Sequence, residues 1–203
     1  MDDIEAMLRN PTYQPALSVL KGARNGLVYG AKIRLPHALV MTFLFGRGDL
    51  RTKLQTIYKA TKQHSTNLAK FVAIYKTLLI LQKRFNGGKE REYDTLFAGL
   101  VGGYAVFSER NAVNEQIILY VLSRVVASFI PRQPTPYTAA NGKPHPPNPK
   151  AFAALATLTW GSVMYLFHTR RQTLQTGMVN SMQYLYLDSN SWSSLKTLLW
   201  HNN

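Results

Sequence analysis

Residues 18–30 read SVLKGARNGLVYG and place a glycine at every fourth position. The series consists of Gly22, Gly26 and Gly30, and Ser18 extends it towards the N-terminus. Positions four residues apart lie on one face of an α-helix, so the series predicts a narrow, flat stripe of small residues. Such a stripe allows the backbone of a second helix to approach closely.

The free-energy cost of glycine in a helix indicates whether this helix lies in water or in lipid. In water, each glycine inside a helix costs about 1 kcal/mol relative to alanine. In a bilayer, close packing of small residues drives helix association, because apolar side chains gain little by leaving lipid. The series therefore predicts an all-α membrane helix bundle, although a flexible glycine loop is the other interpretation. Gly99 and Gly103 form a second pair of this kind, which we expect to pack in the same way.

Composition is strongly basic and contains no cysteine. The 203 residues include 24 Lys and Arg against 10 Asp and Glu, a net charge of +14. Such a charge suits an anionic partner, either nucleic acid or a lipid surface. The mean hydropathy of −0.14 is low for a multi-pass membrane protein and argues against the membrane interpretation. Neither MDDIEAMLRN at the start nor LWHNN at the end resembles a targeting signal, so we expect any such signal to be internal.

Apolar runs and prolines divide the chain into three parts. We expect an N-terminal amphipathic segment at 1–14, a membrane helix bundle at 15–171 and a polar-aromatic tail at 172–203. Seven of the ten prolines fall in residues 131–149, which predicts an extended connector inside the bundle region. Residues 151–169 carry no charged side chain and are long enough to span a membrane.

The remaining apolar runs predict further helices. The helix with the glycine series is expected to continue past Pro36 as a kinked span, and Asp49 is expected to cap a helix over 50–83. The latter helix is either a membrane segment with a basic entry or a soluble amphipathic helix. Residues 95–108 and 116–130 form either two short membrane helices or one long helix with a polar break.

Basic side chains occupy a second face of the first helix. Lys21, Arg24 and Lys32 fall roughly opposite the glycine stripe, so they cannot simply face acyl chains. They must reach the headgroups or line a watery cavity, where they would form a possible path for anions.

Catalytic and metal-binding patterns are missing from the sequence. The five histidines are scattered, and none has a second histidine or a carboxylate at metal-site spacing. No phosphate-binding loop and no pairing of a nucleophile with a base is visible. We therefore expect a protein that is not an enzyme and that uses neither a metal nor a cofactor.

Four segments resemble a known family. The segments are VLKGARNGLVYGAKIRLPHALVMTFLF, NLAKFVAIYK, GLVGGYAVF and SMQYLYLDSNSW. Together they resemble the peroxisomal membrane protein 4 family and, more distantly, the mitochondrial Tim translocase channel superfamily. The resemblance implies about four membrane helices in the peroxisomal membrane, with no established enzyme activity and an undefined molecular role.

The same resemblance implies the partners. Besides membrane lipid, these are the cytosolic import receptor and the docking peroxin, which read internal basic and apolar segments. The candidate targeting residues here are Arg47, Arg51, Lys53, Lys59 and Lys62. Homo- and hetero-oligomers both remain open.

Two other classes of protein were weighed. One is a translocase-like or channel subunit of the mitochondrial inner membrane, which would have the same fold and a different subcellular location. The other is a soluble, basic, helical nucleic-acid-binding module. The spread of the basic residues along the chain and the charge-free run at 151–169 argue against this module, so we expect no nucleic acid as partner.

Overall fold

The computed structural model describes residues 8, 10–132, 146–191, 193 and 194. In this part of the chain the secondary structure is helical, with one isolated antiparallel bridge between Arg132 and Pro147 and no strand. The expected all-α class is thus confirmed for the described residues. The elements are α2 (Gln14–Phe45), α3 (Leu50–Phe85), α4 (Glu92–Phe107), α5 (Ala112–Ser128), α6 (Pro149–Thr169), η1 (Arg171–Thr173), α7 (Thr176–Tyr186) and η2 (Asp188–Asn190).

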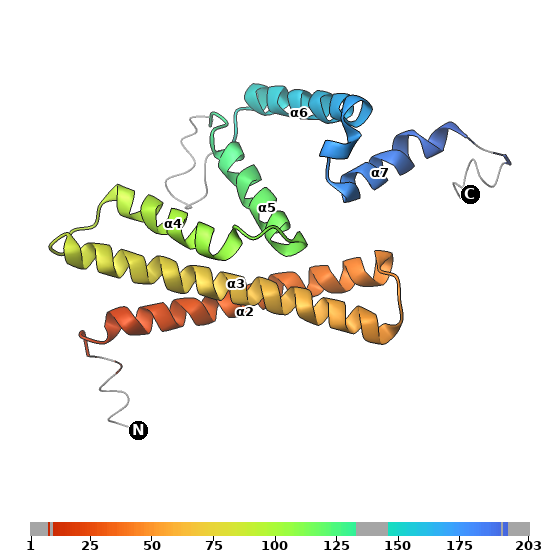
Figure 1. Cartoon of the computed structure of the whole chain (residues 1–203). Coiled ribbons are helices and arrows are strands. Elements are labelled where there is room, and N and C mark those ends of the chain that lie inside the picture. Colours follow the sequence, from red (N-terminus) through yellow and green to blue (C-terminus); the bar gives the residue numbers. More distant parts are fainter. Residues whose placement is uncertain (1–7, 9, 133–145, 192, 195–203) are drawn as a thin grey trace. The chain divides into compact units, whose positions relative to one another are not determined.

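The chain forms two compact units, Met1–Arg124 and Val125–Asn203. In the first unit, α2 and α3 run side by side as an antiparallel hairpin (Figure 1). Helix α2 continues through Pro36 and ends at Phe45, and the N–H of the C-cap residue Gly46 donates to the carbonyl oxygen of Thr42. The long first helix expected from the glycine series is therefore present.

The turn between α2 and α3 is closed by the expected cap. Gly48 has a φ of 107°, a left-handed conformation that favours glycine. The Asp49 carboxylate accepts a hydrogen bond of 3.1 Å from the N–H of Thr52. Hydrogen bonding by the Thr52 side chain and by its backbone N–H lowers the pKa of the Asp49 carboxyl, because both stabilise the charged form. The predicted N-cap at Asp49 is confirmed.

Helix α4 runs back along the more apolar half of α3 (Figure 1). Gly87 and Gly88, with φ of 63° and 87°, turn the chain between these two helices. Asp94 lies within the first turn of α4 and completes a capping box there, because its carboxylate accepts a 2.9 Å hydrogen bond from the N–H of Arg91, which is the N-cap residue.

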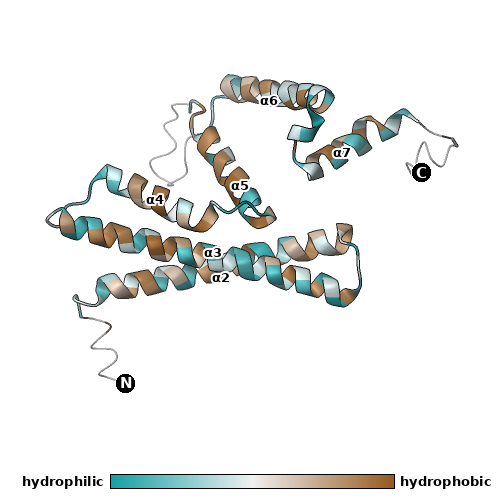
Figure 2. Ribbon diagram, viewed as in Figure 1, coloured by the Kyte–Doolittle hydropathy of each residue, from teal (hydrophilic) through white to brown (hydrophobic). Residues whose placement is uncertain are grey.

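Residues 108–111 separate α4 from α5, so the two apolar runs form two short helices rather than one long helix. Hydrophobic residues dominate α4, α5 and α6, whereas hydrophilic residues recur along the part of α3 next to the α2–α3 turn (Figure 2).

In the second unit, the Asn148 side chain caps α6 by accepting hydrogen bonds from the N–H groups of Lys150 and Ala151. Of the described helices, α6 alone has the length and apolar composition needed to cross a membrane, and only 6% of its apolar window is buried. The count of about four membrane helices therefore stays a prediction. The N-terminal amphipathic segment, most of the connector and the last part of the tail lie largely or wholly outside the described residues.

Candidate functional site

The glycine series lies in the interface between α2 and α3. Gly22, Gly26 and Gly30 are all buried. At Gly26 the two backbones meet, because an added Cβ atom would stand 2.8 Å from the carbonyl oxygen of Leu68 and 3.0 Å from the nitrogen of Ala69. Real Cβ atoms do not approach other atoms so closely. Any larger residue at this position would force the helices apart.

The other two glycines continue the contact in antiparallel register. A Cβ atom at Gly30 would stand 2.7 Å from the Cα atom of Ser65, and one at Gly22 would stand 2.7 Å from the Cδ atom of Lys76. Lys76 uses this space to cross α2, where its ammonium group donates a 2.9 Å hydrogen bond to the carbonyl oxygen of Ser18. Each turn along α2 is thus matched by one turn back along α3.

The small residues of α4 pack one position away from where the sequence analysis places them. No heavy atom of another helix lies within 4 Å of a Cβ atom built on Gly99 or Gly103 in the described chain. Ala98 is instead fully buried, and Gly102 faces α3 with its virtual Cβ atom 3.1 Å from the ring of Phe71. Within the chain's own fold, the expected pair is therefore replaced by Ala98 and Gly102, which have the same spacing. Both pairs are small residues at equal separation, so spacing alone does not distinguish them.

Gly102 and Gly103 provide a matched pair for testing this contact. We expect Gly102→Leu to lower the melting temperature of the purified protein, because the new side chain meets Phe71. Gly103→Leu is expected to leave the melting temperature unchanged or to raise it slightly, because leucine has a higher helix propensity than glycine. The measurement is a thermal melt of both variants in one detergent. Equal losses would show that Gly103 also packs against a helix, supplied by another chain.

A buried polar contact joins α3 to the start of α5. Asn114 is only 2% exposed. Its side-chain oxygen accepts a 2.7 Å hydrogen bond from the amide group of Asn67, and its amide donates a 2.9 Å hydrogen bond to the carbonyl oxygen of Glu109. We call Asn67 and Asn114 the asparagine pair. The pair fixes the loop between α4 and α5 against the middle of α3.

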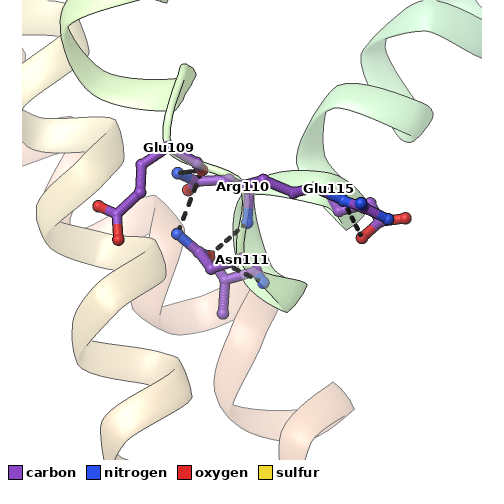
Figure 3. Close-up of polar contacts among 6 residues, drawn as sticks. Glu109, Arg110, Asn111 and Glu115 are labelled. Carbon is purple, nitrogen blue, oxygen red and sulfur yellow. Dashed lines mark hydrogen bonds and ion pairs between the residues drawn. The ribbon is translucent and has the colours of Figure 1, made fainter.

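The loop beside the asparagine pair is held by its own polar contacts (Figure 3). The side-chain oxygen of Asn111 accepts hydrogen bonds of 3.2 and 3.0 Å from the N–H groups of Val113 and Asn114 at the start of α5. Arg110 forms an ion pair of 3.8 Å with Glu115. These residues could not be identified from the sequence, since neither an asparagine nor a short polar break marks a contact between helices by itself.

The predicted basic residues lie on the outside of the hairpin. Lys21, Arg24 and Lys32 are exposed, and no described helix covers them. Arg24 donates a 3.0 Å hydrogen bond to the side chain of its neighbour Asn25. The structure of the single chain thus brings these three residues to one surface and does not enclose them in a cavity.

The five candidate targeting residues gather at the turn of the hairpin and along the following part of α3. We call them the basic tip: Arg47, Arg51, Lys53, Lys59 and Lys62. The ammonium group of Lys53 lies 5.5 Å from the ring centre of Phe43, and that of Lys62 lies 5.9 Å from the ring centre of Tyr58. Basic groups of α3 therefore stand next to the apolar end of α2.

Apolar side chains point outward from the first unit. On α4, Leu100 is 63% exposed and Tyr104 is 79% exposed, although the helix carries no charge between Thr95 and Phe107. Buried positions of α2 and α4 are held by glycine and alanine instead. Among the described residues, no group of three or more His, Cys, Asp or Glu side chains is placed to hold a metal ion.

A helix contact lined by glycine, together with large apolar side chains on the outside, defines a helical membrane protein. The chain belongs to the Tim17/Tim22/Tim23/Pmp24 family, whose model matches residues 12–123. It is 46% identical to human peroxisomal membrane protein 4 over 201 residues, which cover 98% of this chain and 91% of the relative. The protein of the same name from Bos taurus is 44% identical over the same share of both chains. No solved structure matches the chain.

These comparisons confirm the family resemblance and the peroxisomal membrane location that it implied. The family model covers the first unit apart from residues 1–11 and Arg124, and the matched part includes the glycine contact and the asparagine pair.

Proposed function

We propose that the chain is a multi-pass protein of the peroxisomal membrane with a structural, interaction-forming role and no catalysis. The observation that carries this proposal is the contact between α2 and α3, in which glycine backbones meet while large apolar side chains face outward. Water would penalise such an arrangement twice, through the exposed apolar surface and through the helix propensity of glycine. In lipid neither cost applies with the same force.

The apolar part of the first unit has a thickness that suits a bilayer. At one end, the Gln82 side chain donates a 3.2 Å hydrogen bond to the carbonyl oxygen of Asp94 near the start of α4. At the other end lies the asparagine pair. Asn67 and Gln82 are separated by about 22 Å of α3 at 1.5 Å per residue, which is about three quarters of the ~30 Å of a typical hydrocarbon core. We place this layer in the membrane.

The helices within residues 15–171 set the number of times that the chain crosses the membrane. We propose about four crossings in this region, which is preceded by the amphipathic segment at 1–14 and followed by the tail at 172–203. An even number puts both chain ends on one side of the membrane. Protease protection of tags at the two termini and in the connector at 131–149 tests this. Protection of one terminus and cleavage of the other would exclude an even count.

One experiment on a tagged chain tests both its integration into a membrane and its location in the cell. A tagged full chain is expected to stay in the pellet after carbonate extraction and to coincide with a peroxisomal marker rather than a mitochondrial one. Release by carbonate would overturn the membrane proposal. Coincidence with the mitochondrial marker would favour the translocase-like alternative.

For import, we propose that the basic tip and the neighbouring apolar end of α2 are read by the cytosolic receptor and the docking peroxin. Support comes from their proximity in the hairpin, where Lys53 lies over Phe43. Glutamine at all five tip positions is expected to abolish peroxisomal location. The matched control neutralises four basic residues beside the turn between α3 and α4: Lys83, Arg84, Lys89 and Arg91.

A pore-like role is a second candidate, and it rests on the uncovered face of α2. Lys21, Arg24 and Lys32 need headgroups, water or another chain beside them in a bilayer. Several copies of the chain could join these faces around a polar path for anions. Anion flux through purified protein in liposomes is then expected, and a variant with all three residues neutralised should lose it.

A further inference from the structure

A second polar cluster lies between α2 and α3, one turn beyond the glycine contact. Three of its polar atoms are buried and have no hydrogen-bond partner among the described residues: Nε of Arg34, Oγ1 of Thr61 and Nδ1 of His64. Buried polar atoms are normally paired, and each one left unpaired costs about 1–3 kcal/mol when nothing else fills the role. Three such atoms in one region lack the partners that buried polar atoms normally have, which makes this region a candidate for a bound ligand.

The register of the hairpin brings these side chains to the same level. Gly30 lets α3 approach so closely that the Cδ2 atom of His64 would stand 3.3 Å from a Cβ atom at this position. Arg34 follows Gly30 by one turn of α2, and Thr61 precedes Ser65 by one turn of α3. Since the helices are antiparallel, both turns extend in the same direction from the contact between Gly30 and Ser65.

Arg34 supplies the positive charge of the cluster, and no carboxylate among the described residues balances it. Its guanidinium group lies close enough to His64 for the charge to act on the imidazole ring, which is also partly removed from solvent by burial. Arg34 donates a hydrogen bond to the side-chain oxygen of Gln116, which is neutral. In the described part of the chain no Asp or Glu forms an ion pair with Arg34, and the nearby Glu115 is paired with Arg110 instead.

We propose that Arg34, Thr61 and His64 bind one phosphate-type oxyanion, either a lipid headgroup or a free anion. A guanidinium group offers a planar fork of donors that matches such an anion, and the hydroxyl and imidazole groups supply further donors. Arg34 and His64 are only partly buried, so an anion can approach the exposed part of both side chains, and the three unpaired atoms, which are themselves buried, must turn to meet it. This site goes beyond the structural role proposed above.

The position of the cluster suits a headgroup. It lies next to the asparagine pair, where the apolar layer of α3 and α4 ends and the hydrophilic part of α3 begins. A bilayer carries its phosphate groups at this boundary. Arginine between helices at such a depth is expected to be paired.

The test measures binding to the full chain after purification in detergent and removal of lipid. Native mass spectrometry counts bound phosphatidic acid and bound phosphatidylcholine, and inorganic phosphate is added as competitor. We expect one tightly bound anion in the wild type and an affinity at least about tenfold lower in Arg34→Gln. The matched control is Arg24→Gln, which removes the same charge from an exposed position of the same helix and should change the affinity by less than about twofold.

Each outcome decides something. Binding of phosphatidic acid that inorganic phosphate does not displace assigns the site to a headgroup, whereas displacement assigns it to a free anion. Absence of tight binding to the wild type, or equal losses in Arg34→Gln and Arg24→Gln, would overturn the proposal. Should Arg34→Gln fail to stay monodisperse, Thr61→Val decides, because it removes one hydroxyl group and keeps the charge. An unchanged affinity in Thr61→Val would then refute the site as drawn.

Discussion

Replacing Gly26 by leucine is expected to separate α2 from α3 and to remove the folded protein from the membrane. The obstacle is the backbone of α3, because a Cβ atom at this position would stand 2.8 Å from the carbonyl oxygen and 2.9 Å from the carbonyl carbon of Leu68. A flexible side chain could move aside, but a helix backbone cannot. Overpacking typically costs 1–3 kcal/mol, and we expect about 3 kcal/mol or more here.

The measurement is the melting temperature of purified Gly26→Leu together with its abundance in cells. The matched control is Asn25→Leu, which adds the same side chain one residue earlier on the exposed face of α2. We expect the control to retain both properties. A melting temperature for Gly26→Leu within a degree of that of the control would contradict the close contact between α2 and α3.

The second large effect is expected from the asparagine pair. Asn114→Ala leaves the amide group of Asn67 without its partner and removes the shorter of two hydrogen bonds to the carbonyl oxygen of Glu109, which keeps a 3.4 Å bond from Asn111. Since a buried group left unpaired costs about 1–3 kcal/mol and a lost hydrogen bond costs about 1 kcal/mol, we expect a loss of about 2–4 kcal/mol of unfolding free energy. Chemical or thermal unfolding in detergent measures this loss.

A double-mutant cycle isolates the contact between the two asparagines. Asn67→Leu and Asn114→Leu are each expected to destabilise the protein, and the double variant should lose at least about 1 kcal/mol less than the sum. The reason is that the double variant leaves neither amide group of the pair unpaired. Strict additivity of the two changes would mean that the pair does not interact.

The helices could be predicted from the sequence because their signals are local. Glycine at every fourth residue placed α2 and its contact face, Asp49 marked the start of α3, and the charge-free run at 151–169 marked α6. These signals depend on neighbours within one or two turns. Hydropathy alone argued against a membrane protein, since the polar part of α3 lowers the average of the whole chain.

The contacts between distant residues could not be predicted in this way. Asn67 and Asn114 are 47 positions apart, and Arg34 and Gln116 are 82 positions apart. No periodicity within a helix reveals such pairs. For the same reason the sequence could not show which small residues of α4 face α3, because Ala98 and Gly102 have the same spacing as Gly99 and Gly103. Only the packing of Phe71 against Gly102 distinguishes the two pairs.

The length of the α2–α3 hairpin has a mechanical consequence. At 1.5 Å per residue, the 36 residues of α3 extend about 54 Å, well beyond the ~30 Å of a hydrocarbon core. If the layer between Asn67 and Gln82 lies in lipid as proposed, the polar half of α3 extends beyond this layer beside the apolar end of α2, where Leu44 and Phe45 are 69% and 72% exposed and need a cover of lipid or protein. A partner that covers this end would be joined to the membrane-embedded half by two continuous helices, so a tilt applied to one end of the hairpin would be carried to the other.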